Sequence, residues 1–103
     1  PAPTAFAMAT IGGARVLGLE KEIGSLEPGK RADLIAVRLD RPHAWPMFNV
    51  YSQLVYALKA SDVNDVVING RTVVKNRTPL TLNPARIQAE AERYLGLIRK
   101  SLQ

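Results

Sequence analysis

The residue best suited to metal binding or proton transfer in this sequence is His43, its only histidine. A zinc site takes three or four ligands, and its histidines commonly stand at helical or near-adjacent spacing. His43 instead lies between Pro42 and Pro46, with no cysteine in the chain and no carboxylate pair nearby. A Ser-His-Asp triad also lacks an anchor, because no Gly-x-Ser-x-Gly nucleophile elbow is present. We therefore expect His43 to serve the structure or to face solvent.

The acidic residues and the paired glycines also indicate structural roles. Asp33 begins an apolar stretch, so we expect its carboxylate to accept hydrogen bonds from backbone amides at a strand end. Asp62 and Asp65 flank a predicted hairpin, where turn and edge positions suit both. Gly12-Gly13 has neither the Walker spacing nor the dinucleotide-binding fingerprint. The sequence thus predicts no catalytic, cofactor-binding or metal-ligating residue in this chain, and no cofactor held by it alone.

The composition predicts one small domain with neither a nucleic-acid nor a membrane partner. The net charge is +5, but the basic residues are scattered among nine acidic ones rather than gathered beside aromatic residues. No apolar run approaches the length of a membrane span, and no secretory signal is visible. The absence of cysteine excludes disulfides and thiolate metal ligands and is compatible with the cytoplasmic location that we expect.

The first element that the sequence predicts is a helix over Ala5–Leu17. Thr4 suits the N-cap position, and Gly18 can supply the left-handed residue that ends the helix. Gly12-Gly13 costs about 1 kcal/mol per glycine relative to alanine in a helix interior. Glycines tolerated at that cost commonly allow another backbone to approach, so we expect this helix to lie close against a neighbouring element.

A second helix is predicted over Pro84–Leu102, with Asn83 as its cap and proline at the first helical position. Arg86 and Glu90 have the spacing of an ion pair on one helical face. The helix carries one apolar stripe, formed by Ile87, Ala91, Tyr94, Leu95, Ile98 and Leu102.

Strands and turns are predicted between the two helices. Asn69-Gly70 separates Val63–Ile68 from Arg71–Val74, which is the pattern of a two-residue hairpin. Pro28-Gly29 fits a type II turn, and Ala32–Val37 after it forms a strand whose apolar run indicates cover on both faces. Ser52–Lys59 fits a short helix capped by Ser52. The fold class is therefore mixed α/β with about four strands, and so small a sheet rarely closes by itself.

Several segments together resemble the carboxy-terminal part of the amidohydrolase superfamily. They are, in chain order, Ala9–Leu19 (ATIGGARVLGL), Ile23–Ile35 (IGSLEPGKRADLI), Leu54–Ala57 (LVYA), Ser61–Val63 (SDV) and Val67–Arg71 (VINGR). The combination is similar to the branch that holds S-adenosylhomocysteine/methylthioadenosine deaminases, guanine deaminases and triazine chlorohydrolases. The resemblance covers nearly the whole chain. The chain opens at Pro1 without an initiator methionine, which fits processing or a removed tag and also fits a piece cut from a longer protein.

The resemblance implies a (β/α)₈ barrel that carries the chemistry and a smaller β-domain assembled from segments on either side of it. On this reading, residues 1–20 are the last barrel helix and residues 21–80 are the carboxy-terminal part of the composite β-domain. Residues 81–103 are then a C-terminal helix that packs back across the outside. The expected partners are the missing N-terminal barrel and its β-segment.

The resemblance also implies a divalent metal, zinc or iron, bound in the parent enzyme by histidines and an aspartate at barrel strand ends. None of those positions falls in this chain, so no metal or catalytic residue is carried over to it. The parent would act on C–N or C–Cl bonds of a purine- or triazine-like ring. The alternative is a free-standing small α/β domain for protein binding or assembly. Alone, the chain is expected to self-associate through exposed apolar surface and strand edges.

Overall fold

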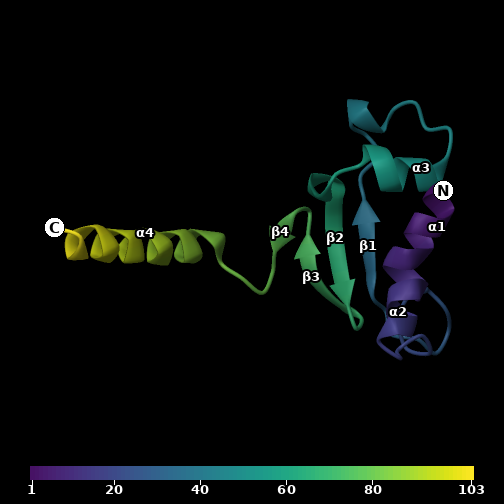
Figure 1. Ribbon diagram of the computed structural model, residues 1–103, viewed down its shortest axis with the longest axis horizontal. Helices are drawn as coiled ribbons and strands as arrows, with labels where there is room; N and C mark the ends of the chain where they lie inside the picture. Colours follow the sequence, from purple (N-terminus) through teal and green to yellow (C-terminus); the bar gives the residue numbers. More distant parts are fainter.

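The computed structural model describes residues 1–103 as a body of helices and strands from which one long helix projects (Figure 1). Its principal extents are 54 × 35 × 25 Å. The body holds a helical layer and an antiparallel sheet lying beside each other. Only four residues are buried, namely Ala2, Ala14, Ala44 and Asp62, and no large side chain is fully enclosed. The mixed α/β class predicted from the sequence is confirmed, but the chain alone encloses almost no core.

The first helix runs without a break through α1 (Ala2–Ala7), a π-helical turn η1 (Met8–Gly12) and α2 (Gly13–Val16). It begins earlier than predicted, because Pro1 occupies the N-cap position and Thr4 lies inside the helix with no capping role. Thr10 Oγ1 donates to Phe6 O over 2.9 Å within the region of the π-helical turn. Gly18, at φ +71°, stands just beyond the helix end, in agreement with the prediction.

The close approach predicted at the paired glycines occurs elsewhere on the helix. A Cβ added at Gly12 would meet only Ala7 O of its own helix, at 3.0 Å. Gly24, in the loop after the helix, has φ +94°, and a Cβ there would lie 2.8 Å from Ala14 Cβ and 2.9 Å from Ile11 Cα. The neighbouring backbone is thus the loop that contains Gly24. It approaches the helix over Ile11 and Ala14.

Four strands form one antiparallel sheet in the order β1 (Leu34–Val37), β2 (Val63–Ile68), β3 (Arg71–Lys75) and β4 (Thr78–Pro79). The hairpin between β2 and β3 is confirmed, since Ile68 pairs with Arg71 and both turn residues have positive φ. Glu27 O accepts from Lys30 N across the turn at Pro28, and Gly29 has φ +90°. These two values agree with the predicted type II turn.

Strand β1 is exposed where its apolar run predicted cover. Within the sheet it pairs only with β2, so its other edge is unpaired by residues 1–103. Leu34 is 39% and Ile35 55% exposed. The prediction failed for this chain because no other segment among residues 1–103 packs closely enough on the strand to bury these side chains.

A short helix precedes β2, as predicted, and consists of α3 (Val50–Ser52) and a second π-helical turn, η3 (Gln53–Ala57). Its cap is Asn49 rather than Ser52, because Asn49 Oδ1 accepts from Ser52 N over 3.0 Å. The helix packs on the first helix, where the rings of Phe6 and Tyr51 meet edge to face at 5.5 Å between centroids. Two short 3₁₀ turns, Pro42–Ala44 (η2) and Ala60–Asp62 (η4), flank it in the chain.

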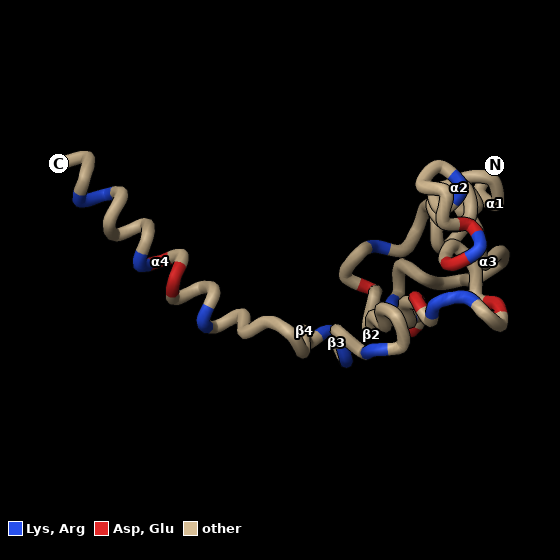
Figure 2. The backbone as a smooth tube through the Cα atoms, turned by 90° about the horizontal axis from the view of Figure 1, so that it is seen from below, with Lys and Arg blue, Asp and Glu red and all other residues tan.

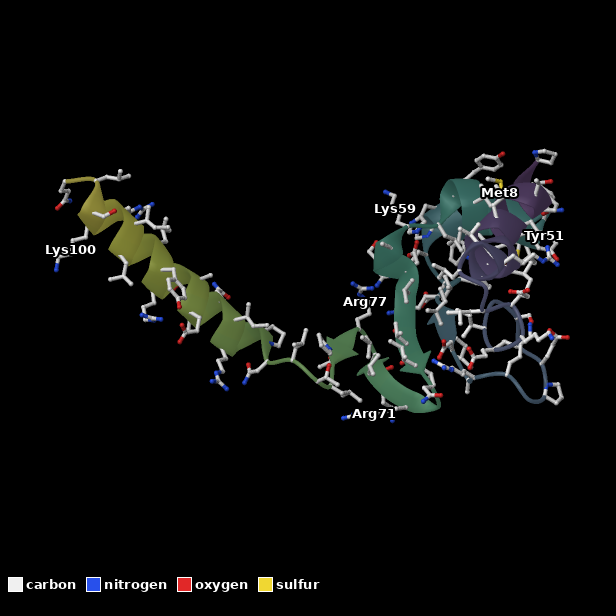
Figure 3. The ribbon with its side chains drawn as sticks, turned by 60° about the horizontal axis from the view of Figure 1, so that its bottom comes forward. Met8, Tyr51, Lys59, Arg71, Arg77 and Lys100 are labelled. Carbon is white, nitrogen blue, oxygen red and sulfur yellow. The ribbon has the colours of Figure 1, made fainter.

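The last helix, α4 (Pro84–Ser101), has the predicted cap, since Asn83 Oδ1 accepts from Arg86 N over 3.1 Å. Glu90 pairs with Arg93 at 3.0 Å and not with Arg86 as expected, and the Arg93 guanidinium also lies over the Tyr94 ring. The helix extends away from the sheet, and side chains stand out from it in all directions (Figures 1 and 3). None of its residues is buried, so its apolar stripe has no cover from this chain.

Candidate functional site: an open apolar groove

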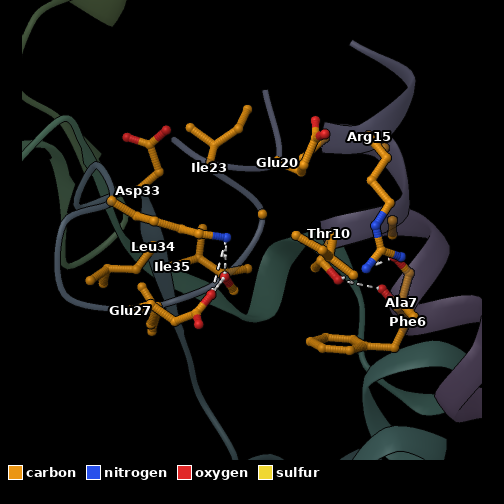
Figure 4. Close-up of a pocket in the computed structure, with 18 of the residues that line it drawn as sticks. Phe6, Ala7, Thr10, Arg15, Glu20, Ile23, Glu27, Asp33, Leu34 and Ile35 are labelled. Atoms are coloured by element: carbon orange, nitrogen blue, oxygen red, sulfur yellow. Dashed lines mark hydrogen bonds and ion pairs between the residues drawn. The ribbon is translucent and has the colours of Figure 1, made fainter. Parts of the chain in front are cut away.

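An open groove lies between the first helix and the sheet (Figure 4). Its volume is about 1340 Å³, and most of its lining is apolar. One wall comes from Phe6, Ile11 and Ala14 of the helix, and the other from Leu34, Ile35 and Val67 of the sheet. The loop that contains Gly24 closes one end. A hollow of this size lined by exposed apolar residues can bury a large apolar partner surface.

Part of the groove lining is a polar cluster of Ser25, Glu27 and Lys30. Lys30 Nζ donates to Ser25 Oγ over 2.7 Å and lies 3.1 Å from Glu27 Oε2, while Ser25 donates its own proton to Glu27. The Ser25 hydroxyl, and after it Lys30, lower the pKa of Glu27. Because the serine proton points at the carboxylate and the lysine acts as a donor, the cluster is not arranged as a Ser-Lys nucleophile pair. It ties together the two sides of the turn at Pro28.

His43 and Asp62 meet at the opposite end of the body. His43 Nε2 lies 2.7 Å from Asp62 Oδ2, and the same oxygen accepts from Lys59 N over 2.8 Å. Asp62 is only 3% exposed. The backbone amide of Lys59, and after it the imidazole of His43, lower the pKa of Asp62. Sequence reasoning missed this pair, because the residues are 19 positions apart and no short motif links them.

The remaining acids singled out in the sequence accept backbone hydrogen bonds. Asp33 Oδ1 accepts from Asn69 N over 2.6 Å, which confirms the predicted strand-end role. Asp65 Oδ1 accepts from Asn76 N over 2.8 Å, and this contact, with a further one from Asn64, lowers the pKa of Asp65. Both carboxylates therefore fix turns of the sheet.

The residues of this chain do not fit a metal centre. No three histidine, cysteine, aspartate or glutamate side chains are grouped as metal ligands. The pair that comes closest to a metal site is His43 and Asp62. It offers only two ligand groups, and these already hydrogen-bond to each other and to the backbone amide of Lys59. Lys and Arg residues are spread over the body and α4 rather than gathered on one face (Figure 2). None of the helices combines the length and the apolarity that crossing a bilayer would require.

The same arrangement of first helix, small sheet and projecting helix occurs in solved zinc-bound enzymes. An adenosine deaminase from Xanthomonas campestris with bound zinc superposes with a TM-score of 0.88 at 39% identity, over 97% of this chain and 23% of its own. A zinc-complexed atrazine chlorohydrolase from Arthrobacter aurescens gives 0.78 at 30% identity, over 89% and 20%. The Amidohydrolase family matches residues 1–73, and the chain belongs to this family. The resemblance drawn from the sequence is thus confirmed.

Curated relatives match all or most of the chain. It is 46% identical over 103 residues to 5-methylthioadenosine/S-adenosylhomocysteine deaminase 1 of Syntrophus aciditrophicus. It is 47% identical over 95 residues to 5-methylthioadenosine/S-adenosylhomocysteine deaminase of Moorella thermoacetica. These matches cover 100% and 92% of this chain, but only 23% and 22% of the relatives. The chain therefore spans less than a quarter of the length of either relative.

Proposed function

We propose that this chain is the carboxy-terminal structural portion of a metal-dependent hydrolase that deaminates the adenine ring of 5′-methylthioadenosine or S-adenosylhomocysteine. The supporting observation is the 46% identity to a deaminase of that name across all 103 residues. Displacement of chloride from a triazine is less well supported, because the triazine enzymes share only 30% identity with the chain. A cytoplasmic location belongs to the same proposal.

In this proposal, the chain contributes packing surface and no reacting group. Residues 1–20 form the last barrel helix, residues 21–80 complete the β-domain, and residues 81–103 form the C-terminal helix. The apolar groove and the free edge of β1 then receive the barrel and the β-segment that precede this chain. Four buried residues are too few to form a stable hydrophobic core for a chain of this length. This supports a larger core that the chain shares with the preceding part.

The metal of the proposed enzyme, zinc or iron, is held outside this chain, because these residues do not offer the ligands for it. When bound, such a metal supplies an activated water for attack on a ring carbon. No step of that chemistry passes through His43 or Asp62. The two side chains are already committed to each other and to the backbone of Lys59.

The test compares the natural polypeptide that carries this sequence with the 103-residue chain alone. The longer polypeptide should release ammonia from 5′-methylthioadenosine and retain a divalent metal after dialysis, whereas the chain alone should do neither. Stoichiometric zinc on the chain alone would contradict the proposal. A natural polypeptide that retains no metal and leaves the nucleoside unchanged would favour the alternative, a free-standing domain for binding or assembly.

A further inference from the structure

The helical layer and the sheet have few direct contacts with each other. The first helix packs on α3 and η3, and the strands pack on their neighbours, while the groove separates the two layers. At one end, the loop after the first helix bridges them, with Arg31 N donating to Glu22 O and Gly70 N donating to Ala32 O. The spacing of the layers at the other end must be fixed by different contacts.

Those contacts converge on Asp62, directly before β2. The chain enters the short helix through the 3₁₀ turn that contains His43, and it leaves through Lys59. The His43 imidazole and the Lys59 amide both bind one oxygen of Asp62, at 2.7 Å and 2.8 Å. Asp62 O also accepts from Arg38 N over 2.8 Å, so the strand on the far side of the loop is held at the same point.

A second set of contacts carries this anchor to the helical layer. Gln53 Nε2, in η3, donates to Ala44 O over 3.1 Å and to Pro46 O over 2.8 Å. Ala44 itself is fully buried. The ring of Tyr51, two residues before Gln53, then packs against Phe6 of α1. A continuous series of contacts thus leads from the sheet through the loop and the short helix to the first helix.

We infer that the His43–Asp62 contact and the contacts of Gln53 with Ala44 and Pro46 form a clasp that sets the width of the groove. The clasp couples the orientation of the first helix to that of the sheet at the end where Phe6 and Tyr51 line the groove. Opening it frees both the short helix and the start of α1, because each is held through the other. The inference rests on contacts within residues 1–103 and does not depend on the proposed reaction.

Hydrogen–deuterium exchange on the natural polypeptide that carries this chain tests the clasp. His43→Ala should speed exchange about tenfold in residues 2–7 and 50–57, the change expected when one hydrogen bond to a charged group is lost. Residues 63–75 should keep their protection. His43→Gln should restore slow exchange, because its side-chain amide can donate to Asp62 in place of the imidazole. Arg38→Ala is the matched control, because it removes mainly the exposed pairing of that side chain with Asp40 and keeps the backbone bond to Asp62.

Faster exchange confined to residues 41–46 would overturn the inference and leave His43 a local turn residue. Equal effects of His43→Ala and His43→Gln, or of His43→Ala and Arg38→Ala, would also overturn it. If His43→Ala unfolds the hairpin as well, Gln53→Ala decides the matter, because it breaks the clasp one contact further on. Faster exchange in residues 2–7 with a protected hairpin then supports the clasp, and unchanged exchange in residues 2–7 rejects it.

Discussion

At the scale of single residues, two kinds of position should be most sensitive to substitution. They are glycines whose backbone has a positive φ and a buried carboxylate that accepts several hydrogen bonds. Gly24 combines a positive φ with contact against the first helix, while Gly29 has a positive φ in open space. Asp62 gathers two donors on one buried oxygen. None of these roles requires a reacting group, in keeping with the structural role proposed for this chain.

The two glycines separate the cost of backbone strain from the cost of a steric clash. Gly29→Ala should destabilise the fold by about 1 kcal/mol, because alanine must adopt a left-handed conformation and meets nothing else. Gly24→Ala should cost roughly 2–4 kcal/mol, since its Cβ also collides with Ile11 and Ala14. Urea unfolding of both variants at low chain concentration measures the difference. Equal costs would show that the loop does not press on the helix.

Asp62 should make stability depend on pH in the acid range. Its pKa is lowered by the Lys59 amide and by His43. The stabilisation is therefore complete above the ordinary aspartate pKa of about 3.9 and is lost as pH falls through the lowered value. Asp62→Asn should lower the melting temperature at pH 7, and its gap from the unmodified protein should narrow below about pH 4. A constant gap in thermal unfolding from neutral to acid pH would mean that the charge of Asp62 contributes nothing.

At the scale of elements, short sequence motifs correctly predicted the features that depend only on neighbouring residues, such as turns and helix starts. Asn69-Gly70 specified the hairpin and Asn83-Pro84 the start of the last helix, and both are confirmed. Thr4 and Ser52 were wrong as caps, because Pro1 and Asn49 stand nearer to where those helices begin. The sequence did not reveal that β1 is exposed or that His43 contacts Asp62. Each of these features depends on which distant segment of the chain lies nearby.

The helix α4 is held by its own propensity rather than by packing, so a change inside it should act locally. A Cβ added at Gly96 meets nothing, and Gly96→Ala should stabilise the helix by about 1 kcal/mol. Amide exchange in residues 93–100 of the 103-residue chain should then slow about fivefold. Ala89→Gly, on the same helix, is the matched control and should have the opposite effect. Slower folding or faster exchange in Gly96→Ala would show that another part of the protein packs closely against Gly96 and leaves no room for a side chain.

At the scale of the whole molecule, three surfaces with apolar side chains are exposed to solvent. The groove, the free edge of β1 and the stripe of α4 all face outward in this chain. Such surfaces drive association when nothing covers them. The relative from Syntrophus aciditrophicus is more than four times as long as this chain, and we propose that the preceding part of such an enzyme covers all three surfaces.

The isolated chain should accordingly self-associate at micromolar concentration, as a two-fold dimer that pairs the edge of β1 or buries the first helix. Ile35→Lys places a charge on the exposed edge and should shift the chain toward monomer in sedimentation or light scattering. Ala89→Lys, on the face of α4 opposite its apolar stripe, adds the same charge, is the control, and should leave association unchanged. A monodisperse, cooperatively melting monomer would contradict this prediction and favour an autonomous domain.

The short connection between the sheet and α4 lowers the affinity that α4 needs in order to stay docked on a covering surface. A short segment, residues 80–83, joins it to the sheet, so a surface within its reach encounters it as an attached ligand. Short tethers of this kind give effective concentrations in the millimolar range. A contact of about millimolar affinity, far too weak to hold a free peptide in a cell, would then already keep α4 docked about half of the time. The stripe can therefore be narrow and bordered by arginines, and still serve to attach the end of the chain.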